Sequence, residues 1–176
     1  MLCLQGAGFV TFNASLPSAV TITALENEQL LQVTFKYGCW LRSFFNCPCN
    51  RKAYFEMVIV RVGEGSQLGF AAEFWSSLTL GDEFSWGVQG HSWKDEDIIG
   101  MACDLEHGLM FVSVNGKYEN KRGIKFENLR ENLFPVFTSR SAVVKFNFGG
   151  VKFKHCPPGD DFYPILSLYR EVAETA

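Results

Sequence analysis

The chain has 176 residues, of which 47% are hydrophobic and 20% charged, and its formal net charge is −3. This length suits one globular domain, residues 1–176, that folds without disulfides or metals. The charge gives no general attraction to nucleic acid or to an anionic membrane. No apolar run reaches the roughly 18 residues of a membrane span, and the N-terminus lacks the basic and apolar regions of a secretory signal. We therefore expect a protein of the cytoplasm or nucleus, without membrane insertion, whose cysteines are free thiols.

Hydrophobic residues recur mostly with a period of two, which predicts short strands. Residues 53–62 are apolar at nearly every position and predict a central strand that is covered on both faces. Asn115-Gly116 predicts a tight turn because this pair readily adopts positive φ angles. The other strands are predicted, in chain order, at residues 9–12, 19–25, 30–37, 68–74, 84–89, 98–104, 109–114, 134–138 and 142–148.

Helix signals are poor, with one turn expected near residues 127–132 and another after Pro164. Many short strands with little helix predict an all-β fold, an antiparallel β-sandwich of two sheets. Strands in residues 1–49 would precede the middle of the chain, and residues 160–176 would form a C-terminal extension.

A series of short motifs runs through residues 50–150 in a fixed order. It resembles the pattern of the SPRY domain family, whose members have a bent sandwich of the concanavalin-like jelly-roll class. The resemblance implies a protein-interaction module, generally not an enzyme, that binds short segments of other proteins through loops at one rim. Such domains serve as substrate-recognition parts of ubiquitin ligases or as docking elements, but neither a PRY segment nor a SOCS box is recognisable here. The matching motifs are Tyr54-Phe55-Glu56, Leu68-Gly69-Phe70, Ser85-Trp86-Gly87, Asp97-Ile98-Ile99-Gly100, Asp104, Phe111, Asn115-Gly116, Phe134-Pro135-Val136 and Val144-Lys145-Phe146-Asn147-Phe148-Gly149.

The stretch from residue 39 to residue 56 contains Cys39, Cys47 and Cys49. A structural zinc site usually takes two closely spaced pairs of ligands, and a redox centre a C-x-x-C at the start of a helix. The spacing here matches neither, so we interpret the stretch as a loop that leads into the following strand. A zinc or thiol site that uses these cysteines is a weaker alternative, and no metal or cofactor is expected.

Acidic pairs and triplets raise one further alternative, because lectins also use β-sandwiches. Asp82-Glu83, Asp95-Glu96-Asp97 and Asp160-Asp161 are the candidate clusters. Oxygen ligands gathered from neighbouring loops could hold calcium in a glycan-binding module. We favour solvated loop charge for these residues, and a turn position for each histidine, since no catalytic signature accompanies them.

Two loops are the candidate binding surface, because exposed aromatic and arginine side chains dominate the energy of protein interfaces. The first candidate group consists of Trp75, Leu80, Asp82, Glu83, His91 and Trp93. The second consists of Arg42, Phe44, Phe45, Asn46 and Arg51. Asp82, Glu83 and Asp95 favour a partner segment with basic residues, and we expect a monomer in isolation. In the alternative interpretation, the tryptophans and phenylalanines of these groups close the ends of the core.

Overall fold

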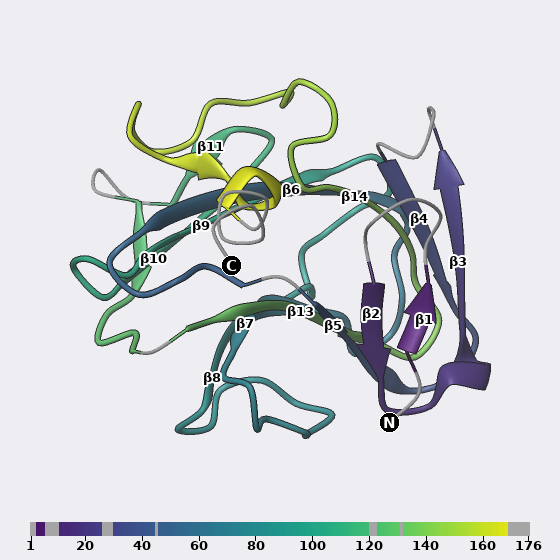
Figure 1. Ribbon diagram of the computed structural model, residues 1–176. Helices are drawn as coiled ribbons and strands as arrows, with labels where there is room; N and C mark the ends of the chain where they lie inside the picture. Colours follow the sequence, from purple (N-terminus) through teal and green to yellow (C-terminus); the bar gives the residue numbers. More distant parts are fainter. Residues whose placement is uncertain are drawn as a thin grey trace.

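The computed structural model describes residues 3–5, 11–25, 30–44, 46–119, 123–130 and 132–168. Two antiparallel β-sheets pack face to face, and in Figure 1 strands β6, β9 and β14 lie above β5, β7 and β13. The prediction of an all-β sandwich with little helix is confirmed. In the described residues the only helical segments are a 3₁₀ turn, Pro17–Ala19, and residues 165–168, and no helix there is long and apolar enough to cross a membrane.

The smaller sheet has six strands, all paired antiparallel. Its order is β1 (Cys3–Gln5), β2 (Thr11–Ala14), β5 (Cys39–Ser43), β13 (Phe134–Ser139), β7 (Gln67–Ala71) and β8 (Ser85–Gln89). Strand β8 is therefore the outermost strand at one end.

The larger sheet has nine strands around the ten-residue strand β6. Strand β15 pairs with β6 in parallel, whereas the other pairs are antiparallel. The main order is β11 (Lys117–Tyr118), β10 (Leu109–Val114), β9 (Ile98–Asp104), β6 (Lys52–Arg61), β14 (Val143–Asn147), β4 (Leu30–Phe35) and β3 (Val20–Leu25), with β12 (Ile124–Phe126) beside β10 and β15 (Tyr163–Pro164) beside β6.

The aromatic-rich core lies between the two sheets. Phe55 contacts Phe70 across it with ring centroids 5.6 Å apart, and Phe146 stacks on Phe148 at 5.2 Å. These side chains alternate along their strands with residues on the outer faces, as the period-two pattern predicts.

Two local predictions are wrong. The cysteine-rich stretch does not begin as a loop, because Cys39–Ser43 forms strand β5 between β2 and β13. Cys39 and Leu41 face the core while Trp40 and Arg42 lie on the opposite face, and both faces are covered. Burial on both faces removes the polar–apolar alternation that marks a half-exposed strand. The expected helical turn near residues 127–132 is also absent from the described part of that segment, where Asn128 has a φ of 64°.

The outer face of the six-stranded sheet carries a second, smaller apolar cluster. Trp40, Ala71, Trp75 and Val136 are buried there, and Leu80 packs against them. Trp75 and Leu80 belong to residues 72–84, the connection from β7 to β8, which folds back over this face of the sheet. We call this connection the β7–β8 loop.

Candidate functional site

The β7–β8 loop is fixed to the sheet at two points. Trp75 is 4% exposed, and its ring lies 5.8 Å from that of Trp40, centroid to centroid. Leu80 covers Gly87, where an added Cβ would lie 2.3 Å from Leu80 Cδ1, and its backbone N–H donates to Gln67 Oε1 over 2.8 Å. A loop anchored in this way keeps its shape without a partner, which lowers the entropic cost of binding.

The end of the loop is a hydrogen-bonded turn. Asp82 Oδ1 accepts bonds from the N–H of Phe84 at 3.0 Å and from Ser85 Oγ at 2.6 Å. Ser85 Oγ in turn accepts from the N–H of Gly81 at 3.0 Å. Aspartate commonly bonds the backbone two residues later in this manner. Asp82 therefore stabilises the conformation of the loop and also gives it a negative charge.

On either side of its anchors, and between them, the loop displays large apolar side chains. The exposed fractions are 90% for Phe74, 56% for Leu78 and 51% for Phe84. Asp82 and Glu83 are also exposed. We call these five residues the loop surface. A partner that covers these apolar side chains removes their surface from water, which lowers the free energy of the complex.

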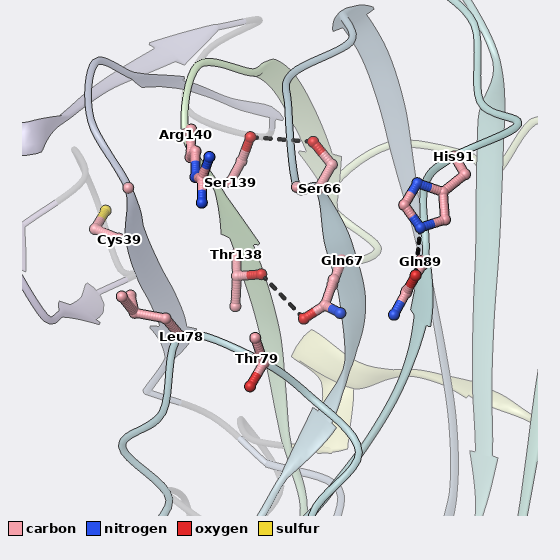
Figure 2. Close-up of a pocket in the computed structure, with 12 residues that line it drawn as sticks. Cys39, Ser66, Gln67, Leu78, Thr79, Gln89, His91, Thr138, Ser139 and Arg140 are labelled. Atoms are coloured by element: carbon pink, nitrogen blue, oxygen red, sulfur yellow. Dashed lines mark hydrogen bonds between the residues drawn. The ribbon is translucent and has the colours of Figure 1, made fainter.

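A pocket of about 240 Å³ lies beside the loop surface, over the sheet (Figure 2). Gln67 and Thr138 contribute from β7 and β13, and Leu78 and Thr79 from the loop. Gln67 Oε1 is occupied, because it accepts from the N–H of Leu80 and, at 3.5 Å, from Thr138 Oγ1. His91 is exposed at the pocket and contacts Gln89 through its ring.

A second pocket, of about 370 Å³, lies where the loop meets strands β7 and β8. It is lined by Ala72, Glu83, Phe84, Trp86, Asn128 and Arg130. The loop surface thus extends between two recesses, each of which is large enough for side chains of a partner.

One residue of the second predicted group contacts the loop that carries part of the first group. Arg42, from the second group, is 6% exposed, and its guanidinium donates to the carbonyls of Ala72, at 3.4 Å, and Glu73. It also lies 4.9 Å from the centroid of the Phe134 ring. Burial lowers its pKa, while the charge of Glu73 acts in the opposite direction. Arg42 therefore supports the β7–β8 loop from below.

Residues 66–151 match the family model of the SPRY domain. The resemblance to the SPRY family is confirmed over these residues. The crystal structure of the SPRY domain of human HERC1 is similar to this chain with a TM-score of 0.57 and 16% identity, over 77% of this chain and 96% of that one. At this identity the similarity shows the fold, and it agrees with the sandwich described above. SPRY domains are generally protein-interaction modules.

Several signature residues of the SPRY domain hold the fold together. The buried carboxylate of Glu56 accepts bonds from the N–H groups of Lys154, at 2.8 Å, and His155, at 2.7 Å. Asn115 and Gly116 have φ angles of 52° and 75° and close the two-residue turn between β10 and β11, which confirms the predicted turn. These residues identify the fold, and the binding surface must be sought elsewhere.

Other predicted site residues are buried or separate. Trp75 is buried under the loop, and Trp93 is 7% exposed in the main core of the SPRY domain, so neither ring is available to a partner in this conformation. This burial agrees with the alternative interpretation of the two tryptophans as core residues. Of the rest of the second group, Phe44 is 41% exposed, Asn46 is half-buried, and Arg51 lies 5.5 Å from the ring centroid of Tyr163. Phe45 lies outside the described residues.

Among the described residues, the cysteines of the zinc alternative do not form a group of possible metal ligands. Cys39 and Cys47 are buried, whereas Cys49 is exposed. Burial raises the pKa of the Cys39 thiol to about 11, and the Cys47 thiol donates to the carbonyl of Arg51 over 3.4 Å. The raised pKa makes the Cys39 thiol a poor nucleophile and a poor metal ligand, since both roles require the thiolate.

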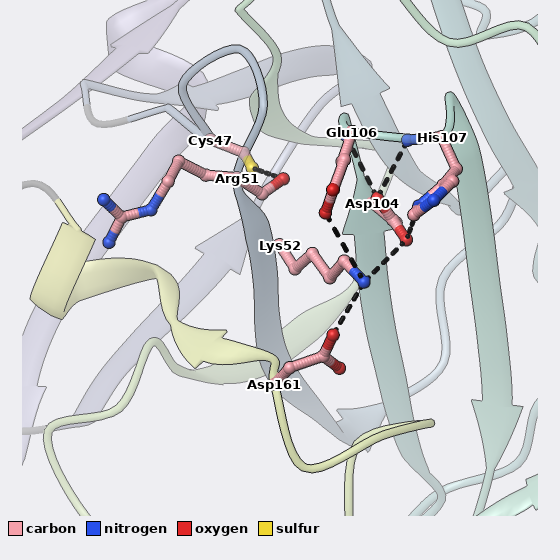
Figure 3. Close-up of polar contacts among 7 residues, drawn as sticks. All are labelled: Cys47, Arg51, Lys52, Asp104, Glu106, His107 and Asp161. Atoms are coloured by element: carbon pink, nitrogen blue, oxygen red, sulfur yellow. Dashed lines mark hydrogen bonds and ion pairs between the residues drawn. The ribbon is translucent and has the colours of Figure 1, made fainter.

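The described residues contain one group with the spacing of metal ligands, Asp104, Glu106 and His107. Figure 3 shows the amine of Lys52 beside it, with Nζ 3.3 Å from Asp104, 3.7 Å from Glu106 and 2.6 Å from Asp161. The lysine supplies the positive charge that a metal ion would bring. We therefore read this cluster as an ion-pair network between β6, β9 and the C-terminal segment.

The candidate binding residues predicted from the sequence do not include Phe74, Leu78 or Phe84. The sequence pattern predicts Phe74 in a strand at 68–74, but β7 ends at Ala71. A signal was present, since these apolar residues fall in a region that also contains serine, glycine and acidic residues. An apolar residue in a loop can either pack against the sheet or remain exposed to solvent. Only the structure shows that Trp75 and Leu80 pack against the sheet while their neighbours are exposed.

Proposed function

We propose that this chain is a non-catalytic protein–protein interaction module that recognises a short peptide segment or loop of a partner. It would do so through the loop surface, as a docking or substrate-recognition part of a larger protein such as a ubiquitin ligase. The observation that carries the proposal is the exposure of Phe74, Leu78 and Phe84 on a loop that is anchored at Trp75 and Leu80. Membership of a family of interaction modules supports the non-catalytic part.

The energetics of the loop surface favour binding. Covering one large apolar side chain contributes roughly 1.5–3 kcal/mol. Because Trp75, Leu80 and Asp82 already hold the loop, little of that gain is lost in ordering it. Asp82 and Glu83 would favour a partner segment with lysine or arginine, and would act mainly on the association rate and on specificity.

The test is affinity capture from a cell lysate with quantitative mass spectrometry. The double variant Phe74→Asp, Leu78→Asp replaces exposed side chains only, so the fold should persist, as circular dichroism can verify. Tyr37→Asp is the matched control, because Tyr37 is 65% exposed and lies outside the loop surface.

We expect partners that are retained by the wild type and by Tyr37→Asp but are lost with the double variant. A loss of two apolar contacts reduces the affinity about 100-fold or more. Partners that persist with the double variant would show that another surface binds them. A direct measurement with the purified partner, by calorimetry, would then distinguish weakened binding from altered complex composition.

A further inference from the structure

Strand β8, at one end of the six-stranded sheet, has one unpaired side. Among the described residues, β7 is its only neighbouring strand. The N–H of Ala72 donates to the carbonyl of Phe84 at 2.9 Å, and the N–H of Gly90 to that of Ser66 at 2.8 Å. In an antiparallel pair every second residue bonds to the neighbouring strand. Residues 84, 86, 88 and 90 therefore face β7, and the N–H and C=O groups of Gly87 and Gln89 point away from it.

This unpaired side lacks the usual obstacles to strand pairing. Proteins commonly protect a sheet edge with charged side chains, proline or a bulge. The strand Ser85–Gln89 contains no charged residue and no proline, and its pairing with β7 shows no register shift. Gly87 is half-buried and Gln89 exposed. The edge is therefore open to a further strand.

Both pockets border this edge. Trp86, which packs against the core, lines the pocket with Phe84 and Arg130, whereas Gln89 on the outer face lines the pocket of Figure 2. Side chains of an added strand would alternate between the same two faces. Strand β3, at one end of the larger sheet, is also uncharged, but neither pocket borders it.

Acidic side chains lie at one end of β8. Asp82 and Glu83 are exposed directly before the start of β8. A basic residue at the adjoining end of the added segment would gain a favourable interaction with them.

We infer that the partner segment binds by strand addition to β8. Its main chain would pair with Gly87 and Gln89, an apolar side chain would lie beside Trp86, and a lysine or arginine would lie near Asp82 and Glu83. This inference rests on the proposed function and specifies how that segment is recognised. Main-chain bonds supply affinity in such complexes, and pockets for alternate side chains supply specificity.

The first test compares two substitutions at one position. The probes are dodecapeptides selected from a phage-displayed random library on the whole 176-residue chain. Gln89→Pro removes the outward N–H, and proline is tolerated at such positions of edge strands. Gln89→Ala removes the same side chain but keeps the N–H. We expect the peptide affinity to fall about tenfold or more in Gln89→Pro and to change less than about twofold in Gln89→Ala.

The second test leaves the protein unchanged, so that a folding defect in Gln89→Pro cannot obscure the result. Each amide of a selected peptide is N-methylated in turn, and the affinity of each derivative is measured. Strand addition predicts that methylation lowers the affinity at every second position of the peptide, because every second peptide N–H faces β8. Amide hydrogen exchange should also slow at Gly87 and Gln89 when the peptide binds.

The outcomes separate the two proposals. Peptides that bind Gln89→Pro as tightly as wild type, with no alternation on methylation, overturn strand addition and leave the proposed function standing. If the library yields no peptide that binds the chain, both are overturned. Loss of peptide binding in Gln89→Pro, together with alternating effects of methylation along the peptide, supports both the proposed function and strand addition.

Discussion

At the scale of single residues, buried charges in this domain are held by specific partners. Glu56 is 2% exposed and receives the N–H groups of Lys154 and His155, together with the hydroxyl of Tyr54 at 3.2 Å. The sequence motif that contains Glu56 suggested the family, but the two amide donors lie about a hundred residues further along the chain. Such pairings depend on tertiary structure, which local patterns do not encode.

Replacing Glu56 by glutamine should therefore destabilise the domain. The amide group offers only one acceptor oxygen, and its NH₂ group would face a backbone donor, so we expect a loss of about 1.5–3 kcal/mol. Urea unfolding measures this loss, and amide exchange should quicken at Lys154 and His155. Glu64→Gln is a suitable control, since Glu64 is an exposed residue that pairs with Arg140. An unchanged unfolding midpoint for Glu56→Gln would contradict this role.

The ion-pair network around Lys52 predicts a pH dependence. Burial tends to raise the pKa of Asp104, but hydrogen bonds from His107 and Lys52 outweigh it and hold this pKa below its usual value of 3.8. A carboxyl whose pKa is lowered on folding stabilises the protein above its unfolded pKa, and this contribution disappears as the pH falls through the folded value. The hydrogen bond with Lys52 lowers the pKa of Asp161 in the same direction.

We therefore expect wild-type stability to fall between pH 5 and pH 2, which is about the range over which such carboxyls are protonated. In Lys52→Met the fall should be smaller, because the carboxyls lose the cation that lowers their pKa. Urea unfolding across this range measures both curves. Parallel curves would mean that the Lys52 network contributes nothing to the acid response.

At the scale of elements, most strands follow from the period-two pattern, as the alternating burial along β4 and β14 shows. Strand β5 does not, because both of its faces are buried and its residues include arginine and cysteine. The β7–β8 loop shows a different limit of prediction from the sequence. Its composition indicated a binding loop, but the division into anchors and displayed residues depends on which side chains meet the outer face of the sheet.

The anchors can be tested by comparing two tryptophans. Trp93→Ala opens a cavity in the main core and should destabilise the whole domain by about 3–5 kcal/mol. Trp75→Ala should destabilise it less, since the loop can close over the gap, but should speed amide exchange selectively in residues 72–84. Equal losses in global stability, with no local change in exchange, would show that the loop is part of the cooperative core.

At the scale of the whole molecule, the sandwich separates the five thiols that the structure describes into two environments. Cys39, Cys47 and Cys103 are buried, whereas Cys49 and Cys156 are exposed. Desolvation raises the pKa of Cys103 as it does that of Cys39. The sequence predicted free thiols, but which of them face solvent follows only from the packing of the two sheets.

Alkylation by iodoacetamide should follow this division. We expect Cys49 and Cys156 to react in the native protein, and Cys39, Cys47 and Cys103 only after unfolding, because the reagent cannot reach a buried thiol. Peptide mapping by mass spectrometry after brief labelling gives the order. Rapid native labelling of Cys47 would indicate that the segment around it opens readily.

The residues that hold the β7–β8 loop differ from those that it displays. Trp75 and Leu80 face the sheet, and Arg42 reaches the loop from a neighbouring strand, while Phe74, Leu78 and Phe84 face water. The exposed positions can therefore be randomised together while the scaffold is left intact. A library built on these three positions would provide engineered affinity reagents, and natural selection could have retargeted the domain by the same substitutions.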